Sequence, residues 1–208
     1  MKTRFIGIAL ATLVLIAAAY GDAIFTMGNN PQPNEENVLF QTAQMGTTID
    51  GHTNKTDTKV QFSSSTDTLM AKGGQSDVDA AAGLVTDITF MVPGHTFLDA
   101  IINPFKPGAN GDLIVMVVTN TGTFMHTYGD VHGENFLTIT TTGGEVIDSV
   151  TIDSASGFQD LKQTRISGIS GIVVIPEPSS LLLLGIGLAG LAGIVRRKLT
   201  RYRFLCCS

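Results

Sequence analysis

Tryptophan is absent from the chain, and its only two cysteines, Cys206 and Cys207, lie at the extreme C-terminus. The long middle part therefore has no cysteine that could form a disulfide or act as a thiolate nucleophile. It also has no indole ring on which a sugar could stack. The G-x-S-x-G and H-E-x-x-H motifs are missing as well, so the usual signatures of a serine hydrolase or a zinc protease are not found.

Basic residues are scarce in the middle of the chain. Between Glu35 and Arg165, sixteen aspartates and glutamates stand against six lysines and arginines. A surface with this charge repels nucleic acid and anionic lipid, and it attracts divalent cations. Nucleic acid is therefore excluded as a partner.

The C-terminal part holds an uncharged apolar run at residues 179–195, followed by the basic cluster Arg196, Arg197 and Lys198. As a helix this run would be about 25 Å long, close to the thickness of the hydrocarbon core of a bilayer. The basic side chains after it can reach lipid headgroups. The pattern predicts a transmembrane helix with a cytoplasmic tail.

The N-terminus carries Lys2 and Arg4, followed by an apolar run from Phe5 to Ala19. Small residues then allow cleavage after Ala19 or after Ala23. This pattern predicts a secretory signal peptide within residues 1–23 and makes the Sec translocation machinery a partner. Because basic ends stay in the cytoplasm, everything between them is expected on the outer side of the membrane.

The tripeptide Pro176-Glu177-Pro178, the apolar run and the basic cluster together resemble the tail of the PEP-CTERM family of exported bacterial proteins. The resemblance implies that a membrane exosortase recognises the tail and removes it. It also implies a Gram-negative host and an inner-membrane-anchored intermediate. The mature protein would then reside at the cell surface or in the exopolysaccharide matrix of a biofilm. One departure is the extension Leu199–Ser208, which continues beyond the point where the family usually ends.

The body alternates between apolar and polar residues with a period of two, as half-buried strands do. Residues 84–92 predict such a strand, with an inner face made of Leu84, Thr86, Ile88, Phe90 and Val92. Val60 and Phe62 predict another.

Two further patterns specify strands and the turns between them. The continuous apolar run Leu113–Val118 predicts a central strand that is covered on both faces. Residues 120–122 predict a tight turn into a strand at Thr123–Tyr128. Gly143-Gly144 predicts a hairpin between the strands Phe136–Thr141 and Glu145–Asp153.

The sequence therefore predicts an all-β fold of about eight to ten short strands, arranged as an antiparallel β-sandwich or jelly roll. Residues 133–168 also resemble the β-rich ectodomain of many proteins with this tail. Read from the residues alone, Phe158 is expected in the core and Arg165 is expected to pair with Asp160 or Asp153. The predicted division of the chain is a signal peptide at 1–23, a flexible lead-in at 24–37, a sandwich ectodomain at 38–169, a linker with the Pro-Glu-Pro motif at 170–178, a transmembrane helix at 179–195 and a basic tail at 196–208.

Two groups of residues are candidate metal ligands. His126, Asp130, His132 and Glu134 gather around a predicted turn and could hold a transition metal. Asp77 and Asp79 follow a glycine-rich turn and are candidate calcium ligands, although Ala81 occupies the next ligand position of an EF-hand. The alternative in both cases is a solvated polar loop. No other cofactor is expected.

Three functions remain open at the level of sequence. The first is a non-enzymatic surface or matrix protein, and the second is a carbohydrate- or calcium-binding module of that matrix. The third is a small exported hydrolase, for which two carboxylates would have to meet in space. Tyr128 and Phe124 are candidates for a sugar platform, but their two-residue alternation fits strand residues better.

Overall fold

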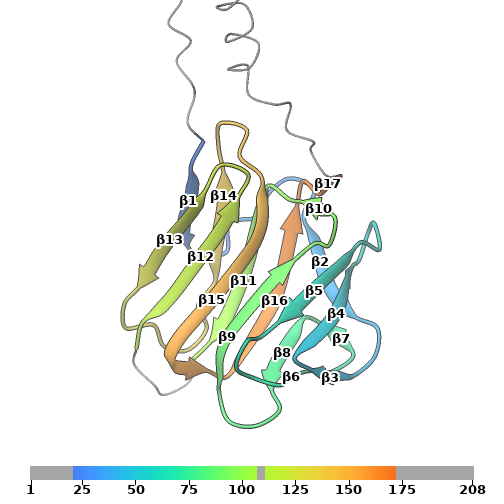
Figure 1. Ribbon diagram of the computed structural model, residues 1–208, viewed down its shortest axis with the longest axis vertical. Coiled ribbons are helices and arrows are strands. Elements are labelled where there is room, and N and C mark those ends of the chain that lie inside the picture. Colours follow the sequence, from blue (N-terminus) through green and yellow to red (C-terminus); the bar gives the residue numbers. More distant parts are fainter. Residues whose placement is uncertain (1–20, 107–110, 172–208) are drawn as a thin grey trace, which may run out of the picture. The chain divides into compact units, whose positions relative to one another are not determined.

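The computed structural model describes residues 21–106 and 111–171. All the regular secondary structure in these residues is β-strand (Figure 1). All strand pairings are antiparallel. The predicted all-β antiparallel class is therefore confirmed, while the finer assignment to a sandwich or jelly roll stays a prediction.

Fifteen strands join in one continuous sheet, and two short strands pair separately. The fifteen are β1 (Ala23–Met27), β2 (Glu36–Phe40), β3 (Gln44–Gly46), β4 (Thr48–Thr53), β5 (Lys59–Ser63), β6 (Leu69–Ala71), β7 (Gly74–Gln75), β8 (Asp77–Ala80), β9 (Val85–Met91), β11 (Asp99–Phe105), β12 (Leu113–Thr119), β13 (Thr123–Tyr128), β14 (Leu137–Thr141), β15 (Ile147–Phe158) and β16 (Asp160–Ser167). The separate pair is β10 (His95–Thr96) with β17 (Ser170–Gly171).

Strand β2 connects the two halves of the large sheet. Its first residues, Glu36 and Asn37, pair with β16, and its next residues, Val38 and Leu39, pair with β4. One half continues from β16 through β11 and β14 to β1, and the other runs from β4 through β5, β9, β15 and β12 to β13. Figure 1 shows β12 and β15 in front of β14 and β11.

The core is one hydrophobic cluster to which both halves contribute. A row of phenylalanine rings crosses it: Phe40, Phe62, Phe90 and Phe97 lie with successive ring centroids 5.5, 5.9 and 6.1 Å apart. Burying one such side chain contributes about 2 to 3 kcal/mol. Phe158 is also fully buried, as the sequence predicted.

Several local predictions are confirmed. Val60 and Phe62 are both fully buried in β5. The turn at residues 120–122 is closed by a 2.8 Å hydrogen bond from the Thr119 amide to the Gly122 carbonyl, and it leads into β13.

Two predicted strand faces were wrong in part. In β12, Leu113, Val115 and Val117 are buried, but the residues between them are only half-buried, so the strand is central without being covered on both faces. In the strand predicted at residues 84–92, Ile88, Phe90 and Val92 are buried as predicted, but at its start Val85 is buried and Leu84 is exposed, the reverse of the prediction. The cause is an irregularity in the partner strand β15, which shifts the pairing register between Asp153 and Phe158.

The predicted hairpin was also wrong. The glycine pair does turn the chain, with Gly143 and Gly144 at φ values of 64° and 86°. However, β14 pairs with β1 and β11, whereas β15 pairs with β12 and β9. The turn therefore carries the chain from one half of the sheet to the other, because each of the two strands is already paired with other strands along both of its edges.

Most of β1 and the first two residues of β2 lie within residues 24–37, the span predicted as a lead-in. Ala23 is buried and pairs with Thr141, so the strand also begins inside the span predicted for the signal peptide. The predicted signal helix, the transmembrane helix and the basic tail lie outside the described residues. Within the described ones, no helix is long and apolar enough to span a membrane.

Candidate functional site

A fork in the sheet next to β16 creates a polar recess. Arg165 and Ile166 of β16 pair with β2, and Asp160–Lys162 pair with β8. Between these segments, Gln163 and Thr164 pair with neither strand. Gln163 has a φ of 51°, and the register with β11 shifts next to it. The ladder therefore opens at these two residues.

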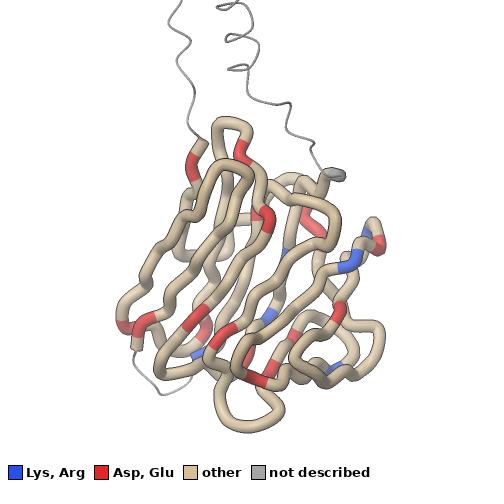
Figure 2. Tube along the Cα trace, in the orientation of Figure 1, with Lys and Arg blue, Asp and Glu red and all other residues tan. Residues whose placement is uncertain are grey.

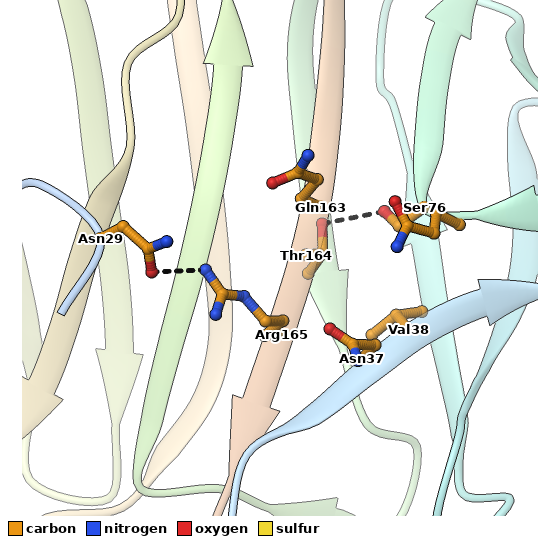
Figure 3. Close-up of a pocket in the computed structure, with 8 residues that line it drawn as sticks. Asn29, Asn37, Val38, Ser76, Gln163, Thr164 and Arg165 are labelled. Carbon is orange, nitrogen blue, oxygen red and sulfur yellow. Dashed lines mark hydrogen bonds between the residues drawn. The ribbon is translucent and has the colours of Figure 1, made fainter. Parts of the chain in front are cut away.

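Ser76 spans this opening. Its amide donates to the Val38 carbonyl at 3.0 Å, and its carbonyl accepts from the Gln163 amide at 2.8 Å. Its hydroxyl donates to Thr164 Oγ1 at 3.1 Å, as Figure 3 shows. One buried serine thus holds β2, β16 and the segment before β8 together.

The opening is a pocket of about 210 Å³ lined by Asn29, Asn37, Val38, Gln75, Ser76, Gln163, Thr164 and Arg165. In Figure 3 the Arg165 side chain points toward Asn29, and its Nη2 donates to Asn29 Oδ1 at 2.6 Å. Its Nη1 donates to Glu35 Oε2 at 3.1 Å. The predicted pairing of Arg165 with Asp160 or Asp153 was therefore wrong, because the register aims this side chain at β2 and the segment before it.

A second pocket of about 320 Å³ adjoins the first and shares Gln75, Ser76 and Gln163 with it. It is also lined by Lys72, Gly73, Asp77 and Lys162. The two pockets form a polar depression that runs from Asn29 to the start of β8.

Three aspartates meet beside this depression: Asp77, Asp79 and Asp160, hereafter the aspartate cluster. One carboxylate oxygen from each residue lies within 4.8 Å of an oxygen of both others. Asp79 lies directly opposite Asp160, and Asp77 opposite Lys162, in the β8–β16 ladder. Because side chains alternate along a strand, all four point to the face opposite the buried Val78 and Leu161.

Two lysines partly neutralise the aspartate cluster. Lys162 Nζ lies 3.2 Å from Asp160 Oδ2 and also 4.3 Å from the centre of the Phe105 ring. Lys72 Nζ lies 3.7 Å from Asp79 Oδ2 on a largely exposed side chain. Figure 2 shows how few Lys and Arg residues accompany the acidic ones over the rest of the described fold.

Electrostatics in the aspartate cluster disfavour three negative charges. Burial raises the pKa of Asp160 to about 6, and Lys162 offsets only part of that effect. Burial, and then the charge of Asp77, also raise the pKa of Asp79. Asp160 Oδ1 and Asp77 Oδ1 are both buried and accept no hydrogen bond.

Residues 174–198 match a known protein family, the PEP-CTERM protein-sorting motif. The chain carries a PEP-CTERM sorting tail. The match includes Pro176, Glu177 and Pro178 as well as Arg196, Arg197 and Lys198, the residues on which the predicted resemblance was based. Neither the curated proteins nor the solved structures include a significant match to this chain.

The PEP-CTERM tail establishes the coarse biology of the chain. It marks an exported protein that is anchored in a membrane and then processed, and it makes an exosortase the processing partner. The matched residues lie outside the described ones, so the geometry of the tail is not part of the structure. The match does not extend into the folded body, whose own role has to be argued from its residues.

The other candidate ligands do not come together. No three of His126, Asp130, His132 and Glu134 offer ligand atoms close enough for a metal, since the aspartate cluster is the one such group in the described ranges. His126 instead stacks on Phe25 with ring centroids 5.5 Å apart. Its exposed ring thereby connects the edge strands β13 and β1.

The candidate sugar platform is not available on the surface. Tyr128 is buried in β13, and Phe124 is partly buried against the core. Both therefore serve the fold, which is the alternative that their spacing already allowed.

Sequence reasoning missed two polar residues that the fold buries. Asp160 joins the cluster from a strand eighty residues away, and no local pattern marks it. Lys106 is also buried, and its ammonium donates to the hydroxyls of Ser154, at 2.7 Å, and Ser156. Burial lowers the pKa of Lys106, with Asp112 acting in the opposite direction. Lys106 directly follows β11 and precedes Pro107, and nothing in this stretch of sequence indicated that it would be buried.

Proposed function

We propose that this chain is a non-enzymatic protein of the cell surface or exopolysaccharide matrix of a Gram-negative bacterium. In this proposal the Sec machinery exports it, residues 179–195 anchor it in the inner membrane, and an exosortase removes the tail. The observation that carries the proposal is the PEP-CTERM match at residues 174–198, which begins three residues after the last strand ends at Gly171. The sorting signal thus directly follows a folded body.

The character of the body supports a role outside the cell. Its many antiparallel strands and its single core favour a rigid β-sandwich. Its excess of carboxylates keeps it soluble and prevents adhesion to anionic lipid. Such a domain can persist in a hydrated anionic matrix after the tail has been removed.

The side-chain contacts favour a non-enzymatic role. Among the described residues, the histidine rings contact backbone carbonyls, other rings and, for His52, the Asp57 carboxylate at 3.3 Å, and none hydrogen-bonds to a serine or threonine hydroxyl that it could activate. Lys106 could in principle serve Ser156 as a base, but its ammonium is shared with Ser154, whose own hydroxyl donates to the Asp112 carbonyl. Assays of the purified protein on polysaccharide and peptide panels test this point, and turnover that disappears in Ser156→Ala would favour the hydrolase alternative.

Sorting is tested by changing Pro176, Glu177 and Pro178 to alanine in a Gram-negative host that has an exosortase. The variant should accumulate in the inner membrane with its tail intact, while the unaltered chain loses the tail and reaches the cell surface. Glu134→Ala, an exposed loop change in the body, is the matched control and should be sorted normally. Normal processing of the triple variant would contradict the proposal.

The polar pocket supports a second candidate, a carbohydrate-binding role within the same matrix. Its side-chain amides and the Arg165 guanidinium suit the donor and acceptor pattern of sugar hydroxyls. Asn29→Ala should then weaken binding of the host polysaccharide at least fivefold, whereas Gln159→Ala, an exposed change outside the pocket, should not. Equal binding by both variants would remove this candidate.

A further inference from the structure

We propose that Asp77, Asp79 and Asp160 form a binding site for a divalent cation, with Ca²⁺ as the ion that their chemistry selects. The proposal adds a resident ion to the body, and it rests on the proposed export only for the supply of millimolar Ca²⁺. Two of these residues were candidates from the sequence, and the fold supplies the third.

The strand register places like charges where a sheet normally avoids them. Asp79 and Asp160 are directly opposite each other across β8 and β16. Side chains in such a pair have Cβ atoms about 5 Å apart, and like charges there are destabilising. Asp77 stands two residues from Asp79 on the same face and adds a third carboxylate. A cation between them converts this repulsion into attraction.

Two of the carboxylate oxygens are available to a cation. The Asp160 side chain is only 4% exposed, yet its Oδ1 accepts no hydrogen bond. Asp77 Oδ1 is likewise buried and unpartnered. A buried carboxylate oxygen without a donor loses its hydration and gains no hydrogen bond in return, which destabilises the ion-free site. A bound cation would satisfy both oxygens.

The lysines leave the aspartate cluster short of positive charge. Lys162 contacts Asp160 and Lys72 contacts Asp79, but no lysine or arginine of the described residues lies within 4.0 Å of Asp77. Lys72 is 72% exposed at its side chain, so it can move into solvent when an ion enters. Lys162 can keep its position over the Phe105 ring. Lys72 therefore acts as a weak competitor for the same site.

The donor set favours Ca²⁺ over other ions. All three ligands are carboxylates, with no histidine or cysteine that would favour zinc or copper. Oxygens within 4.8 Å of one another can all lie at the 2.3 to 2.6 Å bonds that Ca²⁺ makes. The adjoining 320 Å³ pocket reaches Asp77 and gives water access to the remaining coordination positions. With three protein ligands, the dissociation constant should fall in the range of about 10⁻⁴ to 10⁻³ M found in extracellular modules.

The test is calorimetric titration of the full-length chain in detergent with CaCl₂ alone, and in parallel with MgCl₂. We expect one Ca²⁺ per chain, a dissociation constant of about 10⁻⁴ to 10⁻³ M and much weaker Mg²⁺ binding. Asp160→Asn should weaken Ca²⁺ binding at least tenfold with unchanged β-sheet circular dichroism. Asp130→Asn, which makes the same charge change in an exposed loop, should bind as the unaltered chain does.

Lys72→Met supplies an independent readout because it removes the competing ammonium. It should tighten Ca²⁺ binding severalfold, while Lys55→Met, a change of an exposed lysine outside the aspartate cluster, should leave the affinity unchanged. Absence of saturable binding up to 10 mM CaCl₂, or equal affinity of Asp160→Asn and the unaltered chain, would overturn the proposal. Either result would leave the proposed sorting intact, because sorting is tested separately by changing Pro176, Glu177 and Pro178 to alanine.

Discussion

Asp79 and Asp160 face each other as direct partners in the antiparallel ladder between β8 and β16, although eighty-one positions of sequence separate them. Nothing between them cancels both charges, since Lys72 and Lys162 each contact one of them from the side. This like-charge pair is a weak point of an otherwise regular sheet, and it makes the stability of the ion-free protein depend on pH.

In the presence of a chelator, Asp160→Asn should stabilise the protein at pH 7. The folded-state pKa of Asp160 is raised to about 6, so its contribution to stability is present below the unfolded-state value near 4 and is lost as the pH rises through 6. A shift of this size corresponds to about 2 to 3 kcal/mol. Urea unfolding at pH 4 and pH 7 measures the difference in unfolding free energy between the variant and the unaltered chain. If Asp160→Asn stabilised the protein by the same amount at both pH values, the raised pKa of Asp160 would be contradicted.

Asp87 should show the opposite pH dependence. It accepts hydrogen bonds from the Ser64 hydroxyl at 2.8 Å and from the amides of Ser65 and Thr66 at 2.9 and 3.2 Å. Burial raises its pKa, but these hydrogen bonds outweigh burial, and the pKa lies below its ordinary value. Its stabilising contribution is therefore full above pH 4 and is lost as the pH falls through the lowered folded-state pKa.

Asp87→Asn should accordingly cost about 1 to 3 kcal/mol at pH 7, because an amide cannot accept at both positions. Denaturant unfolding measures the loss, and Asp130→Asn is the matched control. Unfolding free energies within 0.5 kcal/mol of each other, a difference of the size expected for neutral surface changes, would show that the carboxylate does not hold this loop.

We expect the predicted signal peptide to be cleaved after Ala19, so that the mature chain begins at Tyr20. Cleavage after Ala23 would remove Asp22, whose carbonyl accepts from the Thr142 amide at 3.0 Å, and would cut off the first residue of β1. Losing these contacts would cost about 1 to 3 kcal/mol. Mass spectrometry of the exported protein identifies the site. A mature chain beginning at Ile24 would show that the start of β1 is dispensable.

Gly157 should be far less tolerant of substitution than Gly83, although both have positive φ values, of 69° and 78°. A Cβ at Gly157 would lie 2.7 Å from Leu84 Cβ and 3.2 Å from the Val85 carbonyl oxygen, whereas one at Gly83 would meet nothing within 4 Å. Gly83→Ala should cost about 1 kcal/mol from backbone strain alone, and Gly157→Ala about 1 to 3 kcal/mol more from crowding. Thermal unfolding compares the two variants, and equal losses would mean that Leu84 moves away freely.

Local patterns in the sequence predicted strands well and their partners poorly. The alternation around Val60 and Phe62 and the turn after Thr119 depend on neighbouring residues, so both could be predicted. The failed hairpin at Gly143-Gly144 shows the limit, because a turn signal does not reveal whether its two strands pair with each other. That choice depends on the whole sheet.

The candidate site follows the same division. Asp77 and Asp79 could be identified from their spacing next to a glycine-rich turn, because both belong to one short strand. Asp160 could not, since its membership of the cluster depends on the pairing of β8 with β16. The sorting tail, by contrast, could be predicted in full, because the tripeptide, the apolar run and the basic residues follow one another in one continuous stretch of sequence.

The most direct test of the account is mass spectrometry of the protein at both of its ends, after fractionation of a host that has an exosortase. The account predicts a surface or matrix form that begins at Tyr20 and lacks the basic cluster Arg196–Lys198. Finding the chain intact from Met1 to Ser208 in the soluble cytosolic fraction would contradict it.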